Sequence, residues 1–166
     1  MQPTIKTLTP KKLIGKKIIM SLADNKVVSL WQSFMPRRKE INNTVSSDLY
    51  SMQIYDDSFD FTQPTQEFDK WAAMEVTNFD AIPDGMEPFE LVGGLYAVFF
   101  YQGLSTDTSI FRYIFGEWLV CSEYLLDNRP HFEILGETYK NNDPNSEEEI
   151  WIPIKAKTIT NQSLKD

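Results

Sequence analysis

The sequence predicts an α+β protein in which two consecutive βαββ units share one antiparallel sheet. Strand-like alternation and helical periodicity occur in the same order in each half of the chain, and a segment with two prolines and a glycine separates the halves. The 166 residues, 42% of them hydrophobic, supply enough apolar material for a single domain spanning 1–166. Two βαββ units cannot each cover both sheet faces, so we expect them to pair about a pseudo-two-fold axis with a ligand cleft between them.

The first unit is expected over residues 10–77. Its elements are a strand over 12–22, a helix from 26 that breaks near Pro36, and strands over 49–56 and 68–76. Gly15 is a candidate bulge in the first strand. The pair Asp24-Asn25 precedes the helix as its N-cap.

The second unit is expected over residues 91–155 and replays this order. Its elements are a strand over 93–103, a helix over 110–119 capped by Asp107, and strands over 131–136 and 149–155. Overlaying KWAAMEV on IWIPIK places Trp71 and Trp151 at equivalent positions. Overlaying QIYD on EILG does the same for Gln53 and Glu133. The tail over 157–166 is polar and expected to fray.

The charge distribution argues against a duplex-binding protein. The net charge is -8, whereas non-specific affinity for nucleic acid comes mostly from basic residues that neutralise phosphates. Residues 1–40 nevertheless hold nine basic and two acidic residues. This asymmetry indicates either complementary surfaces within the fold or between subunits, or simply a solvated basic face. No direct nucleic-acid partner is expected.

The few soft side chains restrict the chemistry further. One cysteine, Cys121, excludes an internal disulfide, and one histidine, His131, excludes most zinc sites, so neither a metal nor a cofactor is expected. Cys121 lies in an apolar helical stretch, where it is expected to be a small core residue. No apolar run reaches the roughly 18 residues of a membrane span, and no signal-peptide pattern begins the chain. We therefore expect a cytoplasmic protein with no membrane partner.

Three segments of the second half carry a resemblance to a known family. GGLYAVFFYQG, EWLVCSEYLLDNRPHFEILG and EEEIWIPIK together resemble the GyrI-like effector-binding family. That family includes the ligand-sensing domains of AraC-type and multidrug-sensing MerR-type regulators, and stand-alone gyrase-inhibitory proteins. The resemblance implies a small-molecule-binding fold with an acidic residue at the pocket floor, matched here by Glu133, and an aromatic on the closing strand, matched by Trp151. Because the first unit already begins near residue 10, a stand-alone domain without a helix-turn-helix is expected.

Glu133 is the principal candidate for binding. A carboxylate that faces an apolar cavity is costly to ionise, and a lipophilic cation would supply the missing charge while burying its own apolar surface. Alternatively, Glu133 points into solvent or pairs with Arg129 or Lys155. Aromatic walls attract organic cations. The aromatic candidates, each also a candidate core residue, are Trp151, Trp71, Tyr96, Trp118, Tyr101 and Phe99.

Three functions are compatible with these residues. The first is binding of small hydrophobic, cationic or aromatic molecules for sensing or sequestration, as the resemblance implies. The second, also implied by the resemblance because some members of the family are hydrolases, is hydrolysis of reactive electrophilic compounds, with Glu133 as general base and Trp151 positioning the substrate. The third is a gyrase-inhibitor-like interaction with a protein partner, either gyrase or a regulator.

Overall fold

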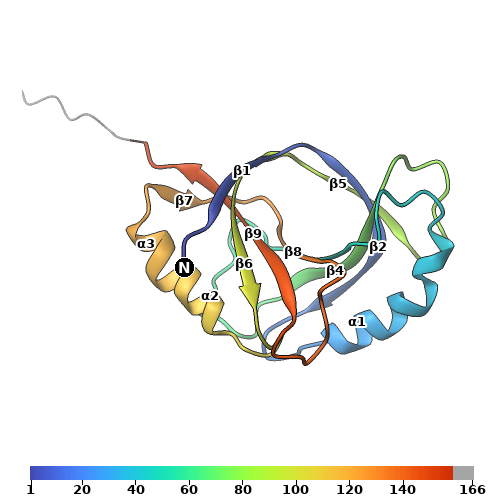
Figure 1. The fold of residues 1–166 in the computed structure, drawn as a ribbon, viewed down its shortest axis with the longest axis horizontal. Helices are drawn as coiled ribbons and strands as arrows, with labels where there is room; N and C mark the ends of the chain where they lie inside the picture. Colours follow the sequence, from blue (N-terminus) through green and yellow to red (C-terminus); the bar gives the residue numbers. More distant parts are fainter. Residues whose placement is uncertain (159–166) are drawn as a thin grey trace, which may run out of the picture.

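The computed structural model describes residues 1–158, so most of the predicted tail over 157–166 lies outside the described residues. Every strand ladder in the described part is antiparallel, which confirms the predicted α+β class. The elements, shown in Figure 1, are β1 (Thr4–Leu8), β2 (Lys11–Met20), α1 (Val27–Phe34), the 3-10 helix η1 (Met35–Glu40), β3 (Leu49–Ile54), β4 (Phe68–Val76), β5 (Glu87–Leu91), β6 (Gly94–Gln102), α2 (Ser109–Tyr113), the π-helix η2 (Ile114–Trp118), α3 (Leu119–Cys121), β7 (Tyr124–Leu126), β8 (His131–Leu135) and β9 (Glu147–Ala156).

The sheet order is β1-β6-β9-β8-β3-β4-β2-β5, with β7 added to β9. The predicted units are β2-α1-β3-β4 and β6-α2-β8-β9, and they meet at the centre of the sheet, where β3 pairs with β8. The hairpin registers agree with the predicted overlay. Met52 lies opposite Trp71 in the first unit, and Phe132 lies opposite Trp151 in the second.

Two strands that the sequence analysis did not predict join the units at the outer ends of the sheet. β1 pairs with β6 of the second unit, and β5 pairs with β2 of the first. The two ladders continue one register, because Leu8 lies opposite Gly94 and Lys11 opposite Leu91. The chain crosses between the units at Gly93, where an added Cβ would lie 2.5 Å from the Leu8 carbonyl oxygen. The strand that precedes the first unit, β1, therefore extends the sheet of the second unit, and the strand that leads into the second unit, β5, extends the sheet of the first.

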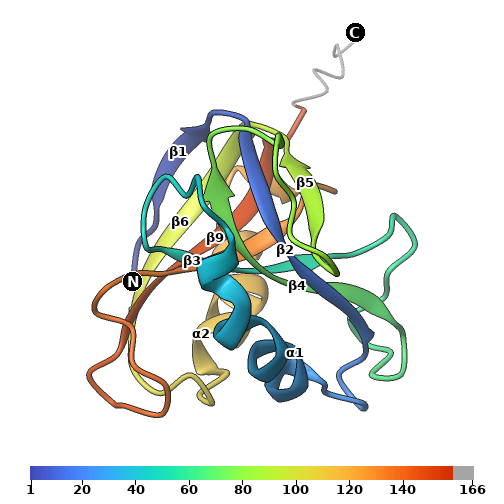
Figure 2. The same ribbon diagram turned by 90° about the vertical axis from the view of Figure 1, so that its right-hand side faces the viewer.

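The helices all lie on one side of the sheet, which we call the helix face (Figures 1 and 2). Leu30 and Phe34 of α1 pack on the strands of the first unit, and Ile110 and Ile114 pack on those of the second. The opposite side, the inner face, has its own core of Leu8, Leu13, Tyr50, Met52, Trp71, Ala73, Leu91, Tyr96, Val98, Phe132 and Trp151. Apolar burial on both faces is the main stabilising contribution to this fold.

The N-cap positions of α1 and α2 are held by Lys26 and Thr108, one residue after the predicted Asn25 and Asp107, and neither makes a side-chain cap bond. The predicted side chains still bond to the first helical amide. The Val27 amide donates to Asn25 Oδ1 at 3.0 Å, and the Ser109 amide donates to Asp107 Oδ1 at 2.9 Å. These bonds satisfy donors that a helix leaves unpaired at its N-terminus. The two helices thus begin in the same way in each unit.

Two local predictions are wrong. Gly15 is not a bulge, because the β2–β4 register runs unbroken from Lys12 to Met20. A Cβ on Gly15 would lie 2.1 Å from the Ala72 carbonyl oxygen, so glycine is required for the close approach of β2 and β4. Cys121 is exposed and not a core residue, because it ends the short helix α3 at the surface.

Candidate functional site

The candidate site lies on the helix face at the centre of the sheet, between the two helix-covered cores. Side chains alternate along β8, so Phe132 belongs to the inner face while Glu133 points to the helix face. Opposite Glu133 on β3 is Ser51, and neither residue belongs to the apolar cluster under α1 or to the one under α2. We call the polar strip formed by Ser51, Gln53, Lys70, Glu133 and Glu148 the central seam.

Glu133 is buried in this seam and has two partners. The amide nitrogen of Gln53 donates to both carboxylate oxygens, at 3.2 and 3.1 Å. Lys70 Nζ lies 3.8 Å from Glu133 Oε2, and the Lys70 and Glu133 side chains are 7% and 12% exposed. The pairing alternative is therefore partly correct, with Lys70 rather than Arg129 or Lys155 as the partner. Hydrogen bonds and an opposite charge offset the cost of burying an ionised carboxylate.

A second carboxylate shares the seam. Ile150 lies opposite Glu133, which places Glu148 two residues further along β9 on the same face. Burial raises the pKa of Glu148 to about 7, the charge of Glu133 adds to this effect, and Lys70 opposes it. Burial also lowers the pKa of the Lys70 amine, against the pull of both carboxylates. The seam thus contains two carboxyl groups and one amine.

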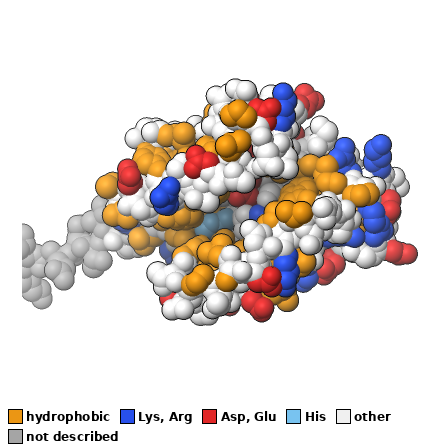
Figure 3. Space-filling model, turned by 90° about the horizontal axis from the view of Figure 1, so that it is seen from below, with side chains coloured by type: hydrophobic (Ala, Val, Ile, Leu, Met, Phe, Trp, Pro, Cys, Tyr) orange, Lys and Arg blue, Asp and Glu red, His pale blue; other side chains and the backbone are white. Residues whose placement is uncertain are grey.

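An aromatic pocket of about 100 Å³ opens next to the seam. One of its lining residues is His131, two residues before Glu133 on the same face of β8. The His131 ring lies 5.0 Å from the ring of Tyr55 and 6.3 Å from that of Phe61. Figure 3 shows the surface hollowed from this side, with the single histidine visible in the hollow. The pocket is lined by Tyr55, Asp56, Asp57, Phe59, Phe61, Leu126, Asp127, Asn128, Arg129 and His131.

The charge of Glu133 in the seam acts on a residue of the pocket. The pKa of the Tyr55 hydroxyl is raised by burial first and then by the charge of Glu133. The π-helix η2 supports two residues of the pocket, because its Phe115 stacks on His131 at 6.0 Å and on Phe61 at 5.8 Å. π-Helical turns occur often at functional sites, where they change the direction of a side chain within a helix.

Three predicted aromatic residues lie on the other side of the sheet. Trp71, Tyr96 and Trp151 belong to the inner-face core, and the Trp151 ring stacks on Phe132 at 5.3 Å. Since Phe132 and Glu133 point to opposite faces, the structure does not bring Glu133 and Trp151 together. The residue opposite Glu133 on β9 is Ile150, and Trp151 lies opposite Phe132.

The other three predicted aromatics pack in the core under α2. The rings of Phe99 and Trp118 meet edge to face at 5.1 Å, and the Tyr101 hydroxyl donates to the Leu104 carbonyl at 3.1 Å. Trp118 also borders a shallow surface cavity of about 360 Å³ beside Cys121, away from the seam. Of the predicted site residues, Glu133 alone belongs to the central seam.

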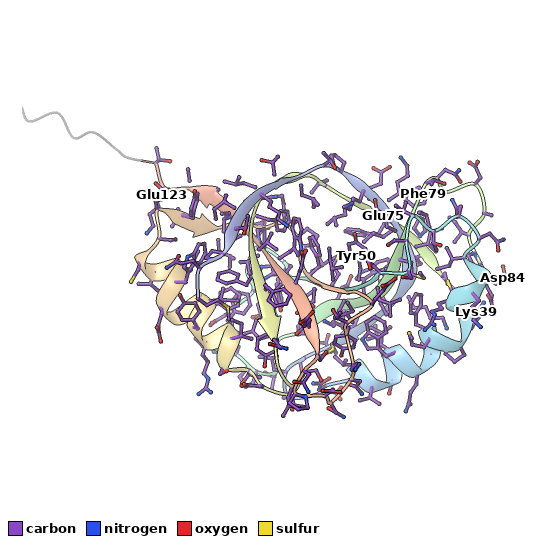
Figure 4. All side chains as sticks on the ribbon, viewed as in Figure 1. Lys39, Tyr50, Glu75, Phe79, Asp84 and Glu123 are labelled. Carbon is purple, nitrogen blue, oxygen red and sulfur yellow. The ribbon has the colours of Figure 1, made fainter. Side chains whose placement is uncertain are left out.

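A polar group on the inner face has a structural explanation. The Tyr50 hydroxyl donates to Glu75 Oε2 at 3.1 Å, and Lys11 Nζ donates to both oxygens of the same carboxylate at 3.0 and 2.9 Å. Figure 4 shows Tyr50 and Glu75 close together near the strands of the first unit. Every member of this group is paired, so it ties β2, β3 and β4 together.

Five residues at or beside the candidate site were not predicted from the sequence, and they lie in three kinds of segment. Lys70 and Glu148 look like solvated charges at strand ends, and only the pairing of the two units brings them inside. Tyr55 and Phe61 belong to the acidic segment YDDSFDF, whose three aromatics among four polar residues were the available signal. Phe115 was concealed by the helical pattern, because a π turn changes the periodicity from which its face is predicted.

Among residues 1–158, no three His, Cys, Asp or Glu side chains gather in a way that would hold a metal ion. No helix in this range combines the length and the apolar character needed to cross a lipid bilayer.

Comparisons with known proteins agree with this architecture. The family profile described as GyrI-like small molecule binding domain matches residues 1–155. The transcriptional regulator BrlR of Pseudomonas aeruginosa is 27% identical over 147 residues. The match covers 86% of the chain and 51% of BrlR, so the chain spans about half the length of this relative.

Two solved structures show the same fold. The structure of SAV2435 bound to tetraphenylphosphonium has a TM-score of 0.68 at 18% identity, covering 93% of this chain and 94% of that one. The C-terminal domain of EcmrR has a TM-score of 0.70 at 12% identity, covering 94% and 98% of the two chains.

Proposed function

The chain belongs to the GyrI-like small molecule binding domain family, and from this premise we propose that the central seam binds small hydrophobic molecules that are cationic or aromatic. The observation that carries the proposal is the pairing of buried Glu133 with Gln53 and Lys70 beside an aromatic pocket. Sensing or sequestration is the use we propose for such binding. A regulator or gyrase would be the protein partner of a domain that acts through another chain.

The charges of the seam favour a cation. Lys70 compensates one of the two carboxyl groups, Glu133 and Glu148, and leaves the other without a fixed counter-charge. A lipophilic monocation would supply that charge and place its apolar groups against the rings of Tyr55 and Phe115. Aromatic rings attract organic cations with about 0.5–2 kcal/mol each, depending on desolvation. Tetraphenylphosphonium, the compound bound to SAV2435, is therefore the first ligand to test.

The test measures tetraphenylphosphonium affinity by calorimetry in the wild type and in Glu133→Gln. Glutamine keeps the shape and removes the charge, so we expect a loss of about 10- to 100-fold, as for a hydrogen bond to a charged group. A neutral ligand should lose much less. Glu75→Gln is the matched control, because it removes a carboxylate on the opposite face and should change affinity less than about threefold. Unchanged affinity in a folded Glu133→Gln variant would remove Glu133 from the site.

One observation favours hydrolysis as a second candidate function. Glu148, whose pKa burial raises to about 7, makes no side-chain hydrogen bond within residues 1–158 and so fits a general base better than Glu133 does. The assay follows hydrolysis of reactive electrophilic compounds by mass spectrometry. Turnover that disappears in Glu148→Gln would support an enzyme, whereas binding without turnover supports the binding function.

A further inference from the structure

His131 is the buried polar side chain of the pocket that the proposed function leaves without a role. The residue is 7% exposed, and neither ring nitrogen makes a hydrogen bond within the part of the chain that the structure describes. Burial alone lowers the pKa of its imidazole to about 4, so the ring is neutral at physiological pH. A neutral imidazole has one donor and one acceptor nitrogen. The buried side-chain atom without a partner among residues 1–158 is Trp71 Nε1, not a nitrogen of His131, so the imidazole nitrogens stay accessible to a group that enters the pocket.

The surroundings hold the imidazole in place without using its nitrogens. Phe115 stacks on one side of the ring, and Tyr55 approaches it edge-on at 5.0 Å. Neither contact satisfies a ring nitrogen. The Tyr55 hydroxyl also makes no hydrogen bond among residues 1–158, so the pocket offers a second unused polar group.

The size and place of the pocket limit what it accepts. Its volume of about 100 Å³ lies below the roughly 300–1,000 Å³ of sites that enclose a drug-sized ligand. It therefore accommodates one substituent of a larger molecule. Because His131 and Glu133 are two residues apart on one strand face, their Cα atoms are separated by about 7 Å. A para-substituted benzyl group spans a similar distance.

We propose that His131 hydrogen-bonds a hydroxyl or amino substituent on the aromatic part of the ligand, so that the site prefers hydroxylated or aminated aryl cations to purely hydrocarbon ones. The inference rests on the proposed function, since the cationic centre of the ligand lies in the seam at Glu133. His131 is then a specificity-determining residue. The aromatic walls bind the ring of the ligand, and the imidazole selects its substituent.

The test compares two cations that differ by one oxygen, benzyltriphenylphosphonium and (4-hydroxybenzyl)triphenylphosphonium, in wild type and in His131→Phe. We expect wild type to bind the hydroxylated cation about 3- to 10-fold more tightly, as for one neutral hydrogen bond. His131→Phe keeps a ring among its aromatic neighbours and should lose this preference. The readout is the ratio of the two affinities within each protein, which an equal loss of affinity for both cations in the variant would not change.

A third cation, (4-methoxybenzyl)triphenylphosphonium, provides a test on wild type that does not depend on a variant that folds. It cannot donate a hydrogen bond, so its affinity reports whether the imidazole acts as acceptor. Preference for the hydroxylated over the methoxylated cation supports the inference. A preference that survives in folded His131→Phe, or equal wild-type affinity for all three cations, overturns the inference and leaves the proposed function intact. Failure of wild type to bind any of them overturns both.

Discussion

Lys70 and Glu133 form a buried ion pair between the two units of the fold. Lys70 lies on β4 of the first unit and Glu133 on β8 of the second, with their charged atoms 3.8 Å apart. Gln53 of β3 lies between these strands and donates to the same carboxylate. The resident cation of the seam is therefore a lysine from the opposite unit, and a ligand cation has to bind beside it.

We predict strong coupling between these two residues in stability. Lys70→Met leaves Glu133 buried without its counter-charge and should lower the free energy of unfolding by about 3–5 kcal/mol. Glu133→Gln should cost about 1–3 kcal/mol, because Gln53 loses a charged acceptor and Lys70 its partner. The double variant should lose clearly less than the sum, and urea denaturation of all four proteins measures the coupling.

Lys17 provides the control for this cycle. Its ammonium lies within 4.0 Å of Asp69 and Glu87, but the side chain is 39% exposed. Exposed ion pairs contribute about 0–1 kcal/mol, so Lys17→Met should have a small effect. Additive losses in the Lys70/Glu133 cycle would show that the pair does not act as a unit.

The pH dependence of stability should contain two opposing contributions. The pKa of Glu148 is raised from 4.5 to about 7, so the folded state binds this proton more tightly and acidification from pH 7 to 4.5 adds stability. The pKa of His131 is lowered from 6.5 to about 4, so acidification from pH 6.5 to 4 removes stability. In wild type the two effects largely cancel between pH 4.5 and 6.5.

Single variants should separate these contributions. In Glu148→Gln the histidine effect remains, and stability should fall by about 1–3 kcal/mol on acidification from pH 6.5 to 4.5, relative to wild type. In His131→Phe the carboxyl effect remains, and stability should rise over the same range, again relative to wild type. Chemical denaturation at several pH values measures both slopes. Parallel curves for the two variants would contradict the assignment of these pKa shifts.

Arg129 should be irreplaceable by lysine. Its Nη2 donates to the Leu95 and Ile154 carbonyls at 2.6 and 3.0 Å, and its Nε donates to Asp127 at 2.7 Å. Gly94, at φ 135°, lies so close that an added Cβ would be 2.4 Å from the guanidinium. Because lysine cannot reproduce a planar fork of donors, Arg129→Lys should cost about 2–3 kcal/mol of stability, measured by thermal or urea unfolding. If Arg129→Lys were as stable as wild type, the positive charge alone would be sufficient at this position, without the fork of hydrogen-bond donors.

Much of the fold could be predicted because periodicity is a local property. The order of the central strands and helices follows from residue spacing, and the helix starts were predicted to within one residue from the polar side chains of Asn25 and Asp107. The edge strand β1 was missed because four of its five residues are exposed and it has no apolar pattern. Its place in the sheet is determined by pairing with β6, which is about 90 residues away in the chain.

The candidate site was harder to predict because it depends on which face each side chain takes. The segment HFEIL is apolar on both sides of Glu133, so the alternation of polar and apolar residues did not predict which sheet face Glu133 takes. A shift of one residue in the strand register would move every side chain to the opposite face. The overlay correctly aligned Trp71 with Trp151 in their hairpins, yet both belong to the inner face. Lys70 could be identified as the partner of Glu133 only once the two units were placed side by side.

Gly15 allows the close contact between β2 and β4. Gly15 lies in an unbroken ladder, and an added Cβ would be 2.1 Å from the Ala72 carbonyl oxygen and 2.6 Å from the Ala73 Cβ. Backbone cannot move aside as a flexible side chain can, so Gly15→Ala should destabilise the fold by about 1–3 kcal/mol or more. Gly116→Ala is the control, since nothing lies within 4 Å of its added Cβ, and alanine in a helix should be neutral or stabilising by about 0.4–1 kcal/mol. Urea denaturation of both variants decides the matter. If Gly15→Ala were as stable as Gly116→Ala, the two strands would have to be farther apart than the structure shows.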